Sequence, residues 1–414
     1  MKISKSKLWT ILLIVAVVVP TFNNFELTFA TWTLLFVTSL RNLYSEEIIK
    51  FSSILGLTII IALCSGFIFY DYPIYRVFRD FTYLIKPILG LLIGYQIIRN
   101  CKLNPFPIII YGSLALAFIH YVKILYGYFF LHMVSLNEIR GLAGYFSDFE
   151  VYGMVILIFS KNFNYDLRPR KKIIYLAIIT ISVLFYFSRT NFIQLGILVI
   201  ALLGYFRLTK RALYVIGLLI ISTFIGYWAI YYSNPRRNGP GAEAFLYKVK
   251  IAPIEAFKTR IDRNDWKDFN DNYRSFENII TIQQVGDEGK GAVLIGKGLG
   301  SRIDLGRVII TNDQEEVRYI PILHNSYMTI YLKAGLIGVL LMIVFLFLLL
   351  KQNKTEDKLI ININYLLVGT GVFLIFSNWV FLGLYFKVDN KALIIGSLIA
   401  FRELIRKNQA VKEL

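Results

Sequence analysis

The sequence predicts an all-α polytopic protein with about 12 transmembrane helices, from its composition, its apolar runs and the charges of its loops. Apolar residues make up 56% of the 414 residues and charged residues only 17%, and the mean hydropathy is +0.58. Soluble domains are about 45–50% apolar and about 25% charged, which excludes that class. The two cysteines, Cys64 and Cys101, are too few for a disulfide framework.

Twelve apolar runs, separated by charged breaks, are candidates for membrane-spanning helices. A hydrocarbon core of about 30 Å needs about 17–25 helical residues, and the second, sixth, eighth and last runs are short by this measure. The first run is predicted to be an uncleaved helix, because no Ala-x-Ala site follows its three lysines. In order, the runs are 8–22, 25–40, 51–70, 82–98, 106–131, 145–160, 173–188, 191–206, 213–232, 325–350, 359–378 and 388–402.

The loops between the runs alternate in charge. The loops on one side, together with both ends of the chain, contain 22 basic residues, whereas the short loops on the other side contain Arg76, Arg79, Arg140, Arg189 and Lys387. Basic residues concentrate in cytoplasmic loops, so we expect both termini in the cytoplasm. The same bias accounts for most of the net charge of +18, without any need for nucleic acid as a partner.

A long polar insert separates the ninth and tenth runs and divides the chain into residues 1–232, 233–324 and 325–414. The insert holds 14 basic and 13 acidic residues and is predicted to lie outside the cytoplasm. Residues 270–285 are predicted to form a helix, with Asp271 as its N-cap. The glycines that follow, from Gly286 to Gly300, predict a flexible turn. One side of the helix is polar at helical spacing: Arg274, Glu277, Asn278 and Thr281.

His324 is the strongest candidate for chemistry, because it lies where the insert meets the tenth run. An imidazole at a membrane–water interface can accept a proton near neutral pH. Lys333 lies inside that run, where a charge is costly and usually faces a cavity or a partner. No metal-binding motif is present in a useful place, so we expect no metal and no cofactor.

Several short motifs accompany His324. The string His324-Asn325-x9-Gly335-x-x-Gly338 begins the tenth run, Ser188-Arg189-Thr190 joins the seventh and eighth, Arg274 precedes the segment 294–300, and Arg140-Gly141 precedes Gly144-Tyr145-Phe146. Over roughly residues 135–345, this combination resembles the O-antigen ligase and O-antigen polymerase superfamily of bacterial envelopes.

The resemblance implies a GT-C-like fold and metal-independent glycosyl transfer at the outer face of the bacterial inner membrane, with the insert as a lid over the active site. The implied substrates are an undecaprenyl-pyrophosphate-linked glycan donor and a glycan or lipid A–core acceptor, and a chain-length regulator is a further partner. His324 is then the catalytic base. The expected substrate-binding residues are Arg189, Arg274, Arg140, Asn325 and Lys333.

Arginine suits a pyrophosphate leaving group, because the guanidinium stays charged and binds phosphate through two parallel hydrogen bonds. Plainer interpretations stay open at this point. Arg140 and Arg189 are also suited to anchoring at lipid headgroups. Arg274 is also placed to pair with Glu277 or Asn278. Lys333 is also able to extend towards the membrane surface.

Three functions fit the pattern. We favour a polymerase that extends a lipid-linked glycan, because the chain is rich in Ile, Lys, Asn and aromatic residues, the last 65 of 414, a composition that we associate with polysaccharide gene clusters. A ligase that moves the finished glycan to lipid A–core or to a protein needs the same groups. A flippase for lipid-linked oligosaccharides also fits twelve spans, but repeated halves are typical of transporters and none is visible here.

Overall fold

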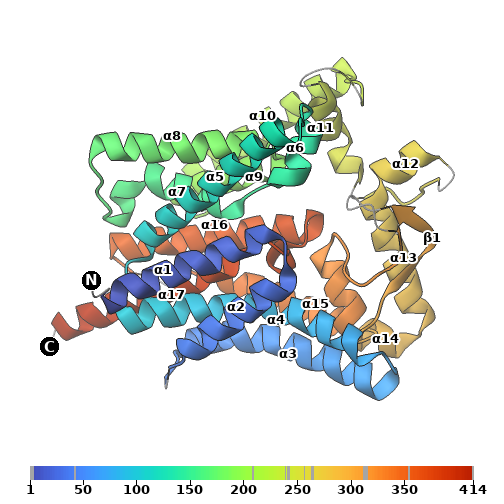
Figure 1. Cartoon of the computed structure of the whole chain (residues 1–414), viewed down its shortest axis with the longest axis horizontal. Coiled ribbons are helices and arrows are strands. Elements are labelled where there is room, and N and C mark those ends of the chain that lie inside the picture. Colours follow the sequence, from blue (N-terminus) through green and yellow to red (C-terminus); the bar gives the residue numbers. More distant parts are fainter. Residues whose placement is uncertain are drawn as a thin grey trace.

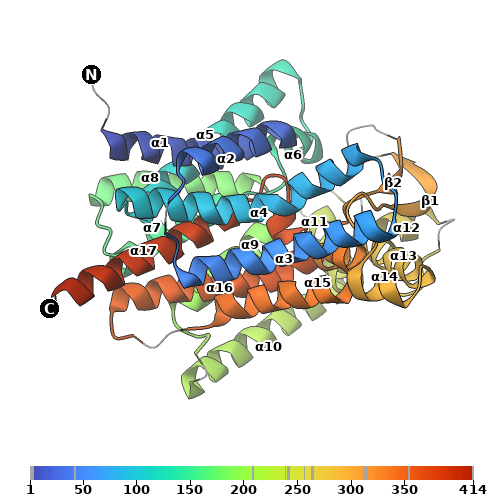
Figure 2. The ribbon, with the colours of Figure 1, turned by 90° about the horizontal axis from the view of Figure 1, so that it is seen from below.

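The computed structural model describes residues 4–41, 43–207, 209–237, 239, 243–255, 257–262, 265–310, 316–352 and 355–412. Helices dominate this part of the chain, and most of them lie side by side along the long axis of the molecule (Figures 1 and 2). Before the insert the chain forms α1 (Lys5–Val18), η1 (Val19–Phe22), α2 (Phe25–Thr38), α3 (Glu46–Phe69), α4 (Ile74–Cys101), α5 (Pro105–Phe130), α6 (Leu136–Ala143), α7 (Asp148–Ile158), η2 (Ser160–Phe163), α8 (Pro169–Phe185), α9 (Arg189–Leu202) and α10 (Lys210–Ser233). After the insert it forms α15 (Ser326–Leu350), α16 (Lys358–Val380), η3 (Gly383–Tyr385) and α17 (Lys391–Lys412).

Within the described residues, 7 helical stretches are long and apolar enough to cross a membrane: Lys5–Phe22, α3, α4, α5, α10, α15 and α16. The prediction of a helical membrane protein is therefore confirmed in this coarse form. The other five predicted runs also fall on helices, but α7 has only 11 residues and α2 and α9 have 14 each. Since a helix rises about 1.5 Å per residue, α7 covers only about half of a hydrocarbon core.

Helices α4 and α17 pack tightly at the centre of the bundle. A Cβ at Gly94 or at Gly396 would collide with the backbone of the opposite helix, so these glycines permit a close approach. Beside this contact Lys86, on α4, donates hydrogen bonds to the carbonyl oxygens of Phe386 and Asp389, at 2.7 and 3.0 Å. Its charge therefore serves the packing of the bundle.

Helix α10 is the least buried of the membrane-length helices. None of its most apolar stretch is buried, whereas 72% of the equivalent stretch of α4 is. Figure 2 shows α10 standing at the edge of the bundle. A helix that is apolar all round and packs against little else is suited to a lipid surrounding.

The two ends of the bundle differ in what they carry. Both termini lie at one end, and the part of the insert from α12 to α14 lies at the other (Figure 1). Two termini at the same end are expected for a chain that crosses the membrane an even number of times. It also separates the basic N- and C-terminal segments from the insert.

The insert is mixed in structure. It forms α11 (Glu243–Glu255), α12 (Trp266–Asp271), α13 (Tyr273–Asp287), α14 (Lys290–Ile295) and a hairpin of antiparallel strands, β1 (Ile303–Ile310) and β2 (Glu316–Ile320), in which Ile303 pairs with Ile320. The hairpin departs from the all-α prediction. Its register places Ile303 and Leu305 in an apolar cluster with Phe276 of α13, and this tertiary packing is not visible in the local pattern.

The predicted helix of the insert exists, but it starts later than expected. The helix α13 begins at Tyr273, and Asn272 precedes it. Asp271 is the last residue of α12, so its assignment as the N-cap was wrong. Asp265 caps α12 instead, because its carboxylate accepts the N–H of Lys267 at 2.8 Å. The two helices are separated at Asn272, whose φ of −118° and ψ of 23° are not helical.

The glycine-rich segment 296–300 is not a flexible turn. Its N–H groups donate to the carbonyl oxygens of Leu332 and Lys333 in α15, at 2.8 and 3.1 Å, and to that of Ala62 in α3, at 2.9 Å. A Cβ at Gly298, where φ is +81°, would collide with the backbone of α3. The glycines are needed because the segment lies between two helices and touches both backbones.

Gly335 provides a stability test of this contact. It interrupts α15 with φ 64° and ψ −162°, and a Cβ there would collide with the backbone of Leu294 and Gly296. We expect Gly335→Ala to lower the melting temperature of the purified protein, since such backbone strain costs about 1–3 kcal/mol. Thermal unfolding in detergent measures this. The matched control is Gly217→Ala in α10, where nothing lies within 4 Å; equal losses in both variants would contradict the prediction.

Candidate functional site

The candidate site lies at the insert end of the bundle, where His324 connects the hairpin to α15. Asn325 caps α15, since its side-chain oxygen accepts an N–H of the first turn at 3.2 Å, and His324 therefore stays outside the helix. The carbonyl oxygen of His324 accepts the N–H of Leu382 at 2.9 Å, just beyond α16. The hydroxyl of Thr329 accepts a hydrogen bond at 3.0 Å from the N–H of Leu323, the residue before His324. The backbone at His324 is thus fixed from three directions.

A buried carboxylate orients the imidazole. Nδ1 of His324 lies 3.0 and 3.1 Å from the two carboxylate oxygens of Glu277 on α13, and the backbone N–H of His324 donates to the same group at 3.0 Å. The side chain of Glu277 is 1% exposed, whereas that of His324 is 47% exposed. Because Nδ1–H donates to the carboxylate, the lone pair is placed on Nε2, which makes no hydrogen bond to any described residue.

The charge of Glu277 sets the acidity of this imidazole. The carboxylate raises the pKa of His324, and burial opposes the increase. Tyr273 packs edge-on against the imidazole, with 5.8 Å between the ring centres. The result is a polarised base whose reactive nitrogen stays open to the exterior.

Two of the predicted arginines meet across α11. Arg189, the first residue of α9, donates to the carbonyl oxygen of Lys248 on α11. Arg274, on α13, pairs with Glu255 at the end of α11, with 3.1 Å between Nη1 and Oε1. The structure therefore excludes the alternative in which Arg274 pairs with Glu277 or Asn278. The first helix of the insert brings residues from two distant elements to the same place.

Arg140 joins this group and completes what we call the basic cluster: Arg140, Arg189, Lys248 and Arg274. Arg140 lies on α6, with its guanidinium 5.7 Å from the ring centre of Tyr145. Its Nε is buried without a hydrogen-bond partner among the described residues. A buried guanidinium N–H without a partner is a donor available to an anion.

The members of the basic cluster and His324 act on one another electrostatically. Burial lowers the pKa of Lys248, and the charges of Arg140 and Arg189 lower it further. The charge of Arg274 also reaches His324 and opposes the increase in the pKa of the imidazole. The four cations of the basic cluster outnumber Glu255, the carboxylate that pairs with Arg274, and this excess favours a negatively charged ligand.

The other two predicted site residues have different surroundings. Lys333 is 1% exposed and donates to the carboxylate of Asp80 at 2.6 Å and to the carbonyl oxygen of Ser301 at 2.5 Å. Its ammonium holds the glycine-rich segment and does not join the basic cluster. Asn325 uses its oxygen as a helix cap, but its Nδ2 is buried and has no partner in the described part of the chain.

Further buried polar groups without partners lie near the end of α16. Both polar atoms of Asn378, which is fully buried near the end of α16, and Nε1 of Trp379 lack hydrogen bonds within the described residues. The ring of Trp379 stacks on Phe257 at 5.6 Å and lies 6.3 Å from that of Tyr327. Buried polar groups without partners beside aromatic rings are available to a polar ligand.

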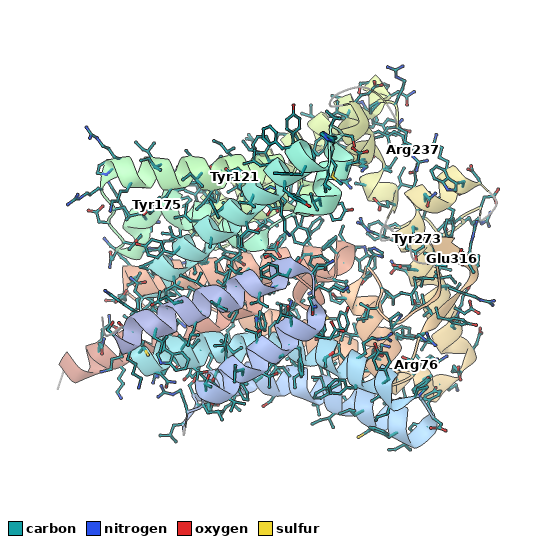
Figure 3. All side chains as sticks on the ribbon, viewed as in Figure 1. Arg76, Tyr121, Tyr175, Arg237, Tyr273 and Glu316 are labelled. Atoms are coloured by element: carbon teal, nitrogen blue, oxygen red, sulfur yellow. The ribbon has the colours of Figure 1, made fainter. Side chains whose placement is uncertain are left out.

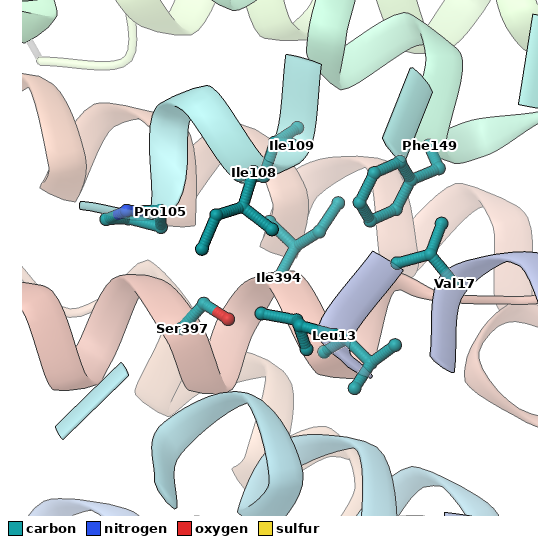
Figure 4. A pocket seen from close by; sticks show the side chains of 9 residues that line it. Leu13, Val17, Pro105, Ile108, Ile109, Phe149, Ile394 and Ser397 are labelled. Carbon is teal, nitrogen blue, oxygen red and sulfur yellow. The ribbon is translucent and has the colours of Figure 1, made fainter. Parts of the chain in front are cut away.

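Other candidate sites carry less chemistry. The described residues contain no group of three or more His, Cys, Asp or Glu side chains placed to hold a metal ion. A small apolar cavity lies between α1, α5 and α17 (Figure 4), and the hydroxyl of Ser397 is the one polar side-chain group among its lining residues. This cavity shares no residue with the basic cluster. Figure 3 shows Tyr273 and Arg237 at the insert end, on the same side of the molecule as the site.

Comparisons with known proteins identify no relative of this chain. No family model matches it, and no curated protein matches it significantly. Its function therefore has to follow from the chemistry of the site.

Sequence reasoning missed three charged members of the site: Glu277, Lys248 and Glu255. A signal for Glu277 was present in the sequence, because Glu277 belongs to the polar side of its helix. When that side faces the protein interior, its residues need polar partners. Lys248 and Glu255 had no such signal. Their roles depend on the position of α11 between α9 and α13, which no local pattern encodes.

Replacement of the buried carboxylate tests the pair directly. Since Glu277 raises the pKa of His324, its imidazolium persists to higher pH than it would without that charge. We therefore expect Glu277→Gln to shift the titration of His324 to lower pH. NMR of ring-labelled histidine measures this, because the chain has 3 histidines and His324→Ala identifies the signal. Glu288→Gln, at a carboxylate paired with Lys297, is the control, and equal titrations in both variants would contradict the assignment.

Proposed function

We propose that this protein is a membrane glycosyltransferase that polymerises undecaprenyl-pyrophosphate-linked oligosaccharide repeat units, as an O-antigen or surface-polysaccharide polymerase. The observation that carries the proposal is the oriented imidazole of His324 beside a basic cluster with a buried, unpartnered guanidinium N–H. A base and an anion clamp in one exterior site are what transfer from a lipid diphosphate requires.

The proposed reaction uses each group once. Nε2 of His324 takes the proton of an acceptor sugar hydroxyl, and the resulting oxygen attacks the anomeric carbon of the donor sugar. The bond between that carbon and the diphosphate oxygen breaks, and the electron pair leaves with the diphosphate. Arg189 and Arg274 stabilise the charge that develops on the leaving oxygen. Glu277 stabilises the imidazolium until its proton is released.

The fold is consistent with this chemistry. We propose that all twelve predicted helices cross or enter the bilayer in a GT-C-like arrangement, with both termini in the cytoplasm of a bacterial inner membrane. The basic loops and the separation of the termini from the insert support this orientation. The insert then covers the active site on the outer face, because α11 and α13 supply four of its charged groups.

His324→Ala tests the proposed base. We expect a rate loss of about 10²- to 10⁴-fold, the usual contribution of a positioned base, with normal expression and membrane insertion. Chain extension on glycolipid gels from a complemented deletion strain measures it. His132→Ala is the matched control, since His132 lies beyond the end of α5 and is exposed. Normal long-chain glycan in the His324 variant would remove the base assignment.

A deletion strain separates the polymerase from the ligase, which needs the same groups. Loss of the polymer with one repeat unit still attached to lipid A–core is the result expected here. Polymer retained on undecaprenyl pyrophosphate, without attachment to the core, would identify a ligase instead. The glycolipid gel and an extract of the lipid-linked intermediates distinguish these outcomes.

A further inference from the structure

A second group of arginines lies at the insert end of the bundle, away from the basic cluster. Arg76 and Arg79 occupy the first two turns of α4, and Arg302 precedes β1. All three are half-buried. Figure 3 shows Arg76 at the same end of the molecule as Tyr273. We call this group the α4 arginines, and neither the proposed base nor the basic cluster uses it.

One carboxylate connects Arg79 to the segment that carries Arg302. Asp80, which is 1% exposed, accepts two hydrogen bonds from Arg79, at 3.1 and 3.3 Å, and one from Lys333 at 2.6 Å. It also accepts the backbone N–H of Gly300 at 2.8 Å, which places Arg302 against the start of α4. Because the carboxylate is shared in this way, the arginines sit on a rigid part of the fold.

The cations of this region outnumber the carboxylates they pair with. Asp80 pairs with both Arg79 and Lys333, whereas Arg76 and Arg302 form no ion pair within the described residues. Burial lowers the pKa of Arg302, and the charges of Arg76 and Arg79 lower it further. Cations held together without counter-charges are unfavourable unless an anion binds them.

The exposed side chains around the group are apolar. Ile74, Tyr75 and Phe78, on the same two turns of α4, are 72%, 70% and 56% exposed, and α4 is one of the helices long enough to span a membrane. An arginine that only anchors a helix extends to water, but Arg79 turns inwards to Asp80. Arginines beside exposed apolar side chains at the end of a span suit a lipid whose headgroup carries phosphate.

We propose that the α4 arginines form a second lipid-phosphate site, in which Arg76, Arg79 and Arg302 bind the phosphate and Ile74, Tyr75 and Phe78 contact the hydrocarbon chain. Given the proposed polymerase, on which this identification rests, the ligand is the diphosphate of the acceptor repeat unit. A polymerase needs two lipid diphosphates at once, one as donor and one as acceptor.

The position of the second site is consistent with this role. A small cavity lined by Asp80, Thr329, Lys333 and Ile322 adjoins it, and Ile322 is two residues from His324 along the chain. The segment around His324 therefore lies next to both the α4 arginines and the basic cluster. The acceptor glycan is the part of the second lipid that reaches from its diphosphate to the base.

Counting bound lipids tests the proposal without any turnover. The purified protein in phosphatidylcholine nanodiscs is titrated with undecaprenyl diphosphate, and in a parallel arm with phosphatidylglycerol, and native mass spectrometry counts the molecules bound. We expect the wild type to bind two diphosphate lipids. Arg76→Gln/Arg302→Gln should lose one of them and Arg189→Gln/Arg274→Gln the other.

The matched control is Arg318→Gln, because Arg318 lies on the same hairpin region as Arg302 but pairs with Asp304 at 2.8 Å. Arg76→Gln alone, at a half-exposed side chain without an ion pair, provides a milder variant if the double variant does not fold. If the Arg76 and Arg302 variants lose binding of both phosphatidylglycerol and undecaprenyl diphosphate, the site is a general lipid-phosphate site. If they lose binding of undecaprenyl diphosphate alone, the site is the proposed acceptor site. Unchanged binding of both lipids in the Arg76 and Arg302 variants would overturn the proposal. If His324→Ala still makes polymer, the polymerase mechanism fails, whereas the lipid count is unaffected.

Discussion

The close backbone contact between the glycine-rich segment 296–300 and the helices α3 and α15 is the constraint on which the site depends. The segment is held by hydrogen bonds to both helices and by the buried pair of Asp80 and Lys333. This segment fixes the position of the insert relative to the bundle. Because α13 precedes this anchor and His324 follows the hairpin after it, Glu277 can meet the imidazole only if the anchor is in place.

Electrostatics in this protein divides into charges that stabilise the fold and charges that remain available. Lys86 and Lys333 are satisfied by carbonyl oxygens and a carboxylate, as buried charges must be. Arg140, Arg76 and Arg302 form no ion pair with the described residues. Arg76, one of the α4 arginines, lies at the insert end (Figure 3). Such unbalanced charge is a property of binding sites rather than of cores.

The proposed chemistry places different demands on the bundle and on the insert. A base needs a fixed orientation, which Glu277 and the cap at Asn325 provide. The proposed diphosphate clamp draws its cations from several elements. Here α6, α9, α11 and α13 each contribute one cation, so the insert and the bundle must both be present to form the basic cluster. On the proposed function, this dependence gives the long polar insert a role in the site.

The sequence alone determined the coarse fold, because membrane-length apolar runs are a local property, and a chain in lipid must satisfy its backbone polar groups within helices. It also suggested His324 as a candidate, because a histidine at the junction of the insert and an apolar run is visible in one dimension, and Arg189 and Arg274 through the resemblance of their motifs. The partner of His324, the role of Lys333, the hairpin and the packed glycines were decided only by the tertiary structure. Each depends on two segments distant in sequence, such as Glu277 and His324 or Asp80 and Lys333, and the free energy of such contacts depends on a separation in space that no local pattern contains.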